Sequence, residues 1–114
     1  MSEPTIFKRI IDKEFRADII YEDDICLAIH DVQPKAPTHF LMIPKKEIVN
    51  VASLEPDDAA IAGHLLIKIK EVADSLGLEN GYRVVANCGA EGGQPVDHLH
   101  FHVLAGRRMK WPPG

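Results

Sequence analysis

The sequence of 114 residues has no sustained run of basic residues, and its nearest approaches are the pairs Lys45-Lys46 and Arg107-Arg108. Its 13 lysines and arginines against 17 aspartates and glutamates leave a formal net charge of −4. Proteins that bind the phosphate backbone of DNA or RNA present clustered positive charge. We therefore expect no nucleic-acid partner, whereas a site for one small anionic ligand remains compatible with this charge.

Cysteine and long apolar runs are also scarce. Cys26 and Cys88 are far apart and form neither a CxxC pair nor a zinc-finger spacing, which favours free thiols in a reducing compartment. The N-terminus lacks a basic region followed by an apolar run, so we expect no signal peptide. Every apolar stretch is far shorter than the roughly 20 residues that span a bilayer. We expect a cytoplasmic protein that in a eukaryote also has access to the nucleus. We expect no membrane partner.

What the sequence does contain is enough apolar content, 46%, for one packed domain over residues 1–114. Apolar residues at three- and four-residue steps predict a short helix near 5–12 and a long helix over 56–76. Pro56 suits the first turn of the long helix, and Gly77 suits its C-terminal end. Short β-branched or alternating segments predict strands at 19–22, 26–30, 39–43, 82–86 and 98–104. The fold class is therefore α+β, with a five-stranded, mainly antiparallel sheet and two helices.

Three histidines alternate with apolar residues in the last predicted strand. Successive side chains of a strand point to opposite faces, so His98, His100 and His102 share one face of it. A water-exposed polar face and a metal site are two open interpretations. For metal, His98 and His100 could share an ion with help from His39 or Asp97. The ends of the triplet lie about 13 Å apart on an extended strand, too far for one ion, so we expect neither metal nor cofactor.

The interpretation that we prefer is phosphorus chemistry. Histidine titrates near neutral pH and serves both as nucleophile and as proton donor. The preceding loop, 87–95, can supply anion-binding groups, because its glycines, among them Gly93, let backbone N–H groups approach a phosphate. Asn87 and Gln94 would add amide donors.

The segment from His98 to Leu104 resembles the His-φ-His-φ-His-φ-φ signature of the histidine triad (HIT) family, where φ is hydrophobic. The resemblance to the Hint branch of that family, nucleotide-binding nucleoside phosphoramidases, covers nearly the whole chain. It implies a homodimer in which two five-stranded sheets join into one of ten strands. The further segments that carry it are residues 6–7, 21–24, 26–31, 36–41, 43–46, 92–94 and 111–114.

The resemblance implies a role for each histidine of the signature. His100 would be the nucleophile that forms a nucleotidyl-imidazole intermediate. His102 would contact the phosphate and assist the leaving group. His98 and His39 would form a hydrogen-bonded pair that supports the nucleophile. The reaction would be hydrolysis of the P–N bond of a purine nucleoside 5′-phosphoramidate.

The resemblance also implies the nucleotide contacts. Asp31 would accept hydrogen bonds from the ribose hydroxyls, a role that suits an ionised, acceptor-only side chain, although a turn or capping aspartate is an equal alternative on its residues alone. Asn87 would bind the phosphate region, and the tail 105–114, with Trp111, would reach toward the partner's active site. The purine pocket would be formed by Ile6, Phe7, Ile10, Ile29, His30 and Val32.

One position departs from the pattern of the branch. Many Hint proteins have a serine after the Gly-Gly-Gln segment, and here the residue is Pro95, which has neither a hydroxyl nor a backbone N–H. The N–H of Val96 or a water would have to compensate, which predicts weaker activity. A nucleotide-binding or scaffold protein with vestigial catalysis and a dinucleoside polyphosphate hydrolase are therefore kept as alternatives.

Overall fold

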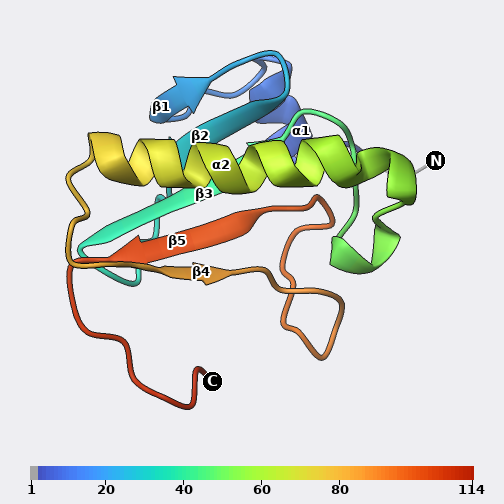
Figure 1. Ribbon diagram of the computed structural model, residues 1–114. Coiled ribbons are helices and arrows are strands. Elements are labelled where there is room, and N and C mark those ends of the chain that lie inside the picture. Colours follow the sequence, from blue (N-terminus) through green and yellow to red (C-terminus); the bar gives the residue numbers. More distant parts are fainter. Residues whose placement is uncertain (1–2) are drawn as a thin grey trace.

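A computed structural model describes residues 3–114; the predicted domain also included residues 1 and 2, which lie outside the described part. Two α-helices and five strands follow one another along the chain (Figure 1). The elements are α1 (Ile6–Ile11), β1 (Ile19–Glu22), β2 (Cys26–His30), β3 (Thr38–Pro44), α2 (Ala59–Ser75), β4 (Arg83–Val85) and β5 (Phe101–Ala105), with 3₁₀ turns at Val51–Ser53 and Pro56–Asp58 before α2.

The strands form one sheet in the order β1-β2-β3-β5-β4, and every neighbouring pair is antiparallel. The predicted α+β class with a five-stranded antiparallel sheet and two helices is thus confirmed. The strand order leaves β4 at one edge of the sheet and β1 at the other (Figure 1).

Alternation along the central strands divides the core between the two faces of the sheet. In β3, Phe40 and Met42 pack in the cluster that contains the α2 residues Leu65 and Ile69, whereas Leu41 belongs to the cluster around α1. Figure 1 shows α2 lying across the near face of the sheet, with α1 behind it. The apolar partners of the histidine segment, Leu99, Phe101 and Val103, pack on the α2 side. The histidines are thereby directed to the α1 side.

Two predicted boundaries are wrong in an instructive way. The long helix was expected from Pro56, but Pro56–Asp58 form a separate 3₁₀ turn before α2 begins at Ala59. The last strand was expected from His98, but β5 begins at Phe101. Pairing with β3 ends at Met42 opposite Phe101. Beyond that point the Leu99 N–H donates to the Ile48 carbonyl instead, at 2.6 Å.

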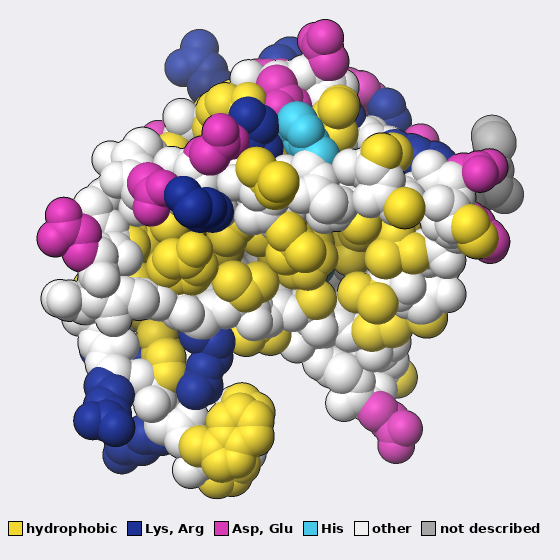
Figure 2. Space-filling view, in the orientation of Figure 1, with side chains coloured by type: hydrophobic (Ala, Val, Ile, Leu, Met, Phe, Trp, Pro, Cys, Tyr) yellow, Lys and Arg dark blue, Asp and Glu magenta, His cyan; other side chains and the backbone are white. Residues whose placement is uncertain are grey.

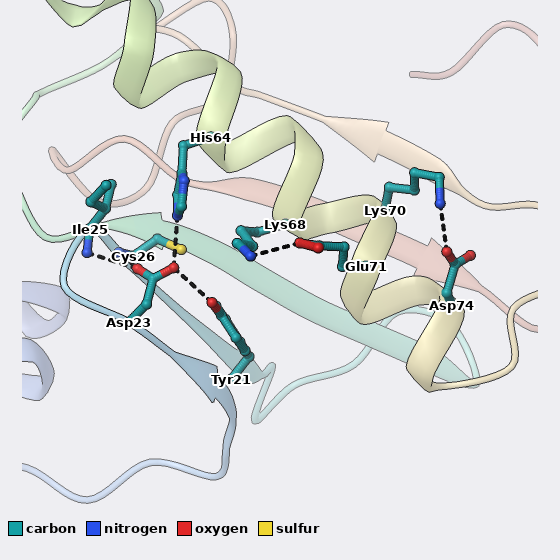
Figure 3. Close-up of polar contacts among 9 residues, drawn as sticks. All are labelled: Tyr21, Asp23, Ile25, Cys26, His64, Lys68, Lys70, Glu71 and Asp74. Carbon is teal, nitrogen blue, oxygen red and sulfur yellow. Dashed lines mark hydrogen bonds and ion pairs between the residues drawn. The ribbon is translucent and has the colours of Figure 1, made fainter.

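Asp23 ties the β1–β2 turn to α2 (Figure 3). Its Oδ1 accepts hydrogen bonds from the backbone N–H groups of Ile25 and Cys26, and its Oδ2 lies 2.8 Å from the Tyr21 hydroxyl and 2.7 Å from Nε2 of His64. Burial raises the pKa of Asp23, but these hydrogen bonds outweigh it and hold the pKa well below its usual range. His64 therefore fastens the helix to the hairpin.

Within residues 3–114, no helix combines the length and the apolar content that a membrane crossing requires.

Candidate active site

A cavity of about 320 Å³ opens between α1, the end of β2 and the start of β5. This volume lies at the lower end of the range of small-molecule sites, roughly 300–1,000 Å³. The walls are mainly apolar, and His102 lies close to both His100 and Asp31. The lining residues are Ile6, Phe7, Ile10, Phe15, Arg16, Ala17, Asp18, Ile29, His30, Asp31, Val32, Leu41, Pro95, Val96, His100 and His102.

Ten of the residues that the sequence singled out meet in this cavity: Ile6, Phe7, Ile10, Ile29, His30, Asp31, Val32, Val96, His100 and His102. Six others lie outside its lining: His39, Asn87, Gly93, Gln94, His98 and Trp111. His39 lies against His102, with their ring centroids 5.1 Å apart, and His98 lies at the edge of Phe7. Trp111 is 83% exposed.

The sequence interpretation missed the loop between α1 and β1, which contributes Phe15, Arg16 and Asp18 to the lining. The predicted hairpin of strands 19–22 and 26–30 contained the information needed to place this loop. Because strands 19–22 and 26–30 pair antiparallel, the residues before the first strand must lie beside those that end the second. The His30 N–H indeed donates to the Asp18 carbonyl at 3.0 Å.

His100 has one committed ring nitrogen and one available nitrogen. Its Nδ1 lies 2.7 Å from the carbonyl oxygen of His98, and a carbonyl only accepts, so Nδ1 carries the hydrogen. In the neutral ring Nε2 then carries the lone pair. His100 is 3% exposed and lines the cavity, with Phe7 packed edge-on against it at a centroid distance of 4.9 Å. The segment 98–100 thus fixes both the tautomer and the orientation of this ring.

The structure corrects the expected pairing of His39 with His98. Nε2 of His39 lies 2.9 Å from Nδ1 of His102. His98 instead directs Nε2 to the carbonyl of Pro44, at 2.8 Å, where β3 ends. The reason is the register of β3 and β5, which brings His39 opposite Leu104 and so diagonally beside His102.

The protons of the His39–His102 pair follow from a backbone contact. The Lys35 N–H donates to Nδ1 of His39 at 3.0 Å, so the hydrogen of the neutral His39 ring is on Nε2. Nε2 donates in turn to Nδ1 of His102. His102 therefore carries its own hydrogen on Nε2, the nitrogen remote from His39.

Burial keeps these rings uncharged. Burial first, and then the neighbouring His100 and His39, lower the pKa of His102 to about 4, while Asp31 opposes the shift. Burial also lowers the pKa of His39, and Asp31 partly offsets that shift. Burial likewise lowers the pKa of His98. These shifts favour the neutral forms of His39, His98 and His102 at neutral pH.

The glycine-rich loop is held together by Gln94, contrary to the expectation that this side chain donates to a phosphate. Its Nε2 donates to the carbonyls of Val49 and Val96, at 2.7 and 2.9 Å. Its Oε1 accepts from the N–H of Gly89 and from Asn50. Both amide hydrogens are thereby used inside the protein, and Gln94 shapes the loop that brings Pro95 and Val96 to the cavity.

Asp31, His39 and His102 each direct one potential metal-ligand atom into a space where all three lie within 4.8 Å of one another. This set differs from the His98–His100 pair considered from the sequence. A metal would need the lone pair of Nε2 of His39, but the Lys35 N–H occupies Nδ1 and leaves the hydrogen on Nε2. These residues are therefore arranged as a hydrogen-bonded network.

The sequence and the fold are both similar to those of known proteins. The family model of the HIT domain matches residues 12–109. An uncharacterized HIT-like protein of Synechocystis is 54% identical over 114 residues, which is 100% of both chains. A HIT family hydrolase from Legionella pneumophila superposes with a TM-score of 0.95 at 44% identity, over 97% of this chain and 100% of that one. A histidine triad nucleotide-binding protein from Candida albicans superposes with a TM-score of 0.81 at 30% identity, over 96% of this chain and 83% of that one.

Proposed function

Because the chain belongs to the HIT domain family, we propose that it is a nucleotide-binding hydrolase of the Hint type. Its reaction is cleavage of the P–N bond of purine nucleoside 5′-phosphoramidates, and the whole chain acts as one HIT domain with a tail at 105–114. One observation carries the proposal: His100 lines the cavity with Nδ1 committed to the His98 carbonyl, which leaves the Nε2 lone pair for a ligand. The names of the Legionella and Candida relatives support the hydrolase and nucleotide assignments.

The reaction proceeds in two displacements at phosphorus. Nε2 of His100 attacks the phosphorus, and the electron pair of the breaking P–N bond goes to the amine nitrogen, which takes a proton from Nε2 of His102. The intermediate is a nucleotidyl-imidazole. Water then attacks its phosphorus and returns a proton to His102, the bond to Nε2 of His100 breaks, and the nucleoside monophosphate leaves.

The cavity suits the rest of the substrate. Its apolar lining residues Ile6, Phe7 and Ile10 offer a surface for a purine ring, together with Ile29, His30 and Val32. Asp31, which also lines the cavity, would accept hydrogen bonds from the ribose, and the N–H of Val96 would donate to a phosphate oxygen. Asn87 would bind the phosphate region, while Gln94, through its hydrogen bonds, and Gly93, through its positive φ, set the course of the loop.

Mass spectrometry tests the covalent step. Wild-type protein quenched during turnover of adenosine 5′-monophosphoramidate should carry one adenylyl group, which peptide mapping assigns to His100. His100→Ala should bind AMP, form no adduct and lose turnover by on the order of 10⁴-fold or more. His64→Ala, which changes a histidine on α2 outside the cavity, should still form the adduct. Normal turnover by His100→Ala would refute the proposal.

Pro95 gives a specific reason to keep a second candidate, a purine nucleotide-binding or scaffold protein with weak catalysis. It lines the cavity where a residue with an N–H could have donated to the phosphate, a charged hydrogen bond worth about 1.5–3 kcal/mol. Tight AMP or GMP binding with no adduct would favour this candidate. Faster cleavage of dinucleoside polyphosphates than of phosphoramidates would favour the third, a polyphosphate hydrolase.

We also propose that the protein is a homodimer. Strand β4 is an edge of the sheet and carries Val84, which is 40% accessible, and on α2 the side chains of Leu66 and Ile67 are 52 and 61% accessible. Figure 2 shows hydrophobic side chains in a band over this face. A second copy that pairs along β4 would extend the sheet to ten strands and cover the band. Light scattering should report a dimer, and Val84→Lys should shift it toward monomer.

A further inference from the structure

The general acid of the proposed reaction meets an obstacle in the His39–His102 pair. To give a proton to a leaving amine from Nε2 and remain neutral, His102 must first hold hydrogens on both nitrogens. The hydrogen on Nδ1 would then face the hydrogen on Nε2 of His39, across a distance of 2.9 Å. Two donors directed at each other at this distance repel.

His39 has no way to remove this conflict by itself. To accept a hydrogen bond at Nε2, it would have to move its own hydrogen to Nδ1. The backbone N–H of Lys35 already points at Nδ1 from 3.0 Å, so that tautomer exchanges one clash of donors for another. The ring is 5% exposed and packed in the sheet, which opposes a flip.

Asp31 supplies the acceptor that this arrangement lacks. Its Oδ2 lies 3.4 Å from Nε2 of His39, and one of its carboxylate oxygens lies within 4.8 Å of a ring nitrogen of His102. Its Oδ1 is bound to the N–H of Gln33 at 2.8 Å, which fixes the carboxylate in place. Oδ2 therefore keeps lone pairs for the Nε2–H of His39, and the carboxylate charge lies close enough to His102 to stabilise a second proton on that ring.

We propose that Asp31 is the counter-ion that allows His102 to hold a second proton, and that it thereby determines the strength of the acid that protonates the leaving group. This inference rests on the proposed function. It makes Asp31 a positioning residue in addition to a ribose contact, since the carboxylate also lines the cavity. Sugar binding and proton delivery would share one side chain.

The surrounding charges support this role. The ionisable groups that act on His102 are His100 and His39, which disfavour its charged form, and Asp31, which favours it. Lys35 acts on His39 and also disfavours positive charge there. Within the described residues, Asp31 is thus the ionisable group that stabilises a proton on this pair.

The test separates proton delivery from ribose binding by using substrates without the diol. One is the phosphoramidate formed from 2′,3′-dideoxyadenosine 5′-monophosphate and an alkylamine, a leaving group that needs a proton. The other is the 4-nitrophenyl ester of the same nucleotide, whose leaving group needs none. Wild type, Asp31→Asn and the control Asp24→Asn, which removes an exposed carboxylate outside the cavity, are compared over a range of pH.

For Asp31→Asn we expect kcat on the phosphoramidate to fall by roughly 10²-fold, the smaller end of the effect of a general acid. The loss on the ester should be at least about tenfold smaller, because only proton transfer is impaired. The alkaline limb of the phosphoramidate profile should move down by about 1 pH unit, since a nearby charge that stabilised the acid has gone. Asp24→Asn should follow wild type.

Two results would overturn the inference while the proposed function stands. Equal losses on both substrates would indicate a general distortion of the site, and an unshifted profile would indicate that Asp31 acts through ribose alone. If wild-type protein releases neither leaving group and forms no adduct, the proposed function fails, and this inference fails with it.

Discussion

Nε2 of His39 lies 2.9 Å from Nδ1 of His102, and the backbone N–H of Lys35 approaches the other nitrogen of His39 at 3.0 Å. The order of donors and acceptors along this line assigns every proton. It leaves His102 with an N–H on the nitrogen remote from His39, and His100 independently keeps a lone pair on Nε2. A ring N–H donor on His102 and a ring lone pair on His100 thus sit side by side, with ring centroids 5.1 Å apart.

Replacing His39 should impair the acid more than the nucleophile. In His39→Leu the ring that packs against His102 and orients it is lost, so His102 can turn Nε2 away from the leaving group, and turnover of an alkylamine phosphoramidate should fall by roughly 10²-fold. His39→Gln keeps an amide donor and should recover part of the loss. Steady-state kinetics on both variants checks this. A fall in nucleotide affinity with unchanged kcat would contradict it.

Activity should survive removal of divalent metals. The His39 tautomer set by Lys35 leaves a hydrogen where a metal would need a lone pair. Initial rates on adenosine 5′-monophosphoramidate should be the same before and after dialysis against EDTA. Loss of activity that added zinc restores would contradict this expectation, as would stoichiometric zinc in the purified protein.

Gln94→Ala should destabilise the loop before β5. The four hydrogen bonds of this side chain disappear, and the carbonyls of Val49 and Val96 lose a donor. We expect the free energy of unfolding to fall by about 2–3 kcal/mol, since net contributions are near 1 kcal/mol per bond and compensate in part through water. Urea denaturation measures this loss of stability. Gln33→Ala, at an exposed glutamine, should change stability little. Equal losses in Gln94→Ala and Gln33→Ala would show that Gln94 does not hold the loop.

The Asp23 network should make stability depend on acid pH. The pKa of Asp23 is below its ordinary value of 3.8 in the folded protein, so protonation favours the unfolded chain. The ionised Asp23 carboxylate makes its full contribution to the free energy of unfolding above about pH 4. This contribution is lost as the pH falls below that value. Asp23→Asn should therefore be less stable by about 1.5–3 kcal/mol at neutral pH. The difference in stability between wild type and Asp23→Asn should therefore disappear at acid pH.

Thermal or urea unfolding of wild type and Asp23→Asn across pH 2–7 measures this gap, with Asp24→Asn as the adjacent exposed control. A gap that stays constant down to the lowest pH would show that the loss comes from packing and not from the carboxylate charge.

The sheet and the composition of the cavity could be predicted because they depend on local patterns. Alternation in 98–104 assigns Leu99 and Val103 to one side and the histidines to the other, and this division holds although residues 98–100 are outside the strand. A short apolar stripe likewise predicts that Phe7 and Ile10 face the sheet. Such patterns need no knowledge of which strand lies beside which.

The histidine pairing could not be predicted, because it depends on register. A shift of two residues between β3 and β5 would leave the facing sides unchanged and bring His39 beside a different member of the triplet. Gln94 presents the same difficulty. Its partners Val49 and Asn50 lie some 45 residues earlier, and nothing in a glycine-rich loop indicates whether an amide turns toward a ligand or toward the protein.

The donor that orients His39 is a main-chain group, located between Pro34 and Pro37 in the loop that leads into β3. The side chain at position 35 can therefore change without removing the N–H that fixes the tautomer of His39. The exception is a third proline there, which would delete the N–H and release the ring. One main-chain N–H in the loop before β3 thus determines which nitrogen of a buried ring holds a hydrogen.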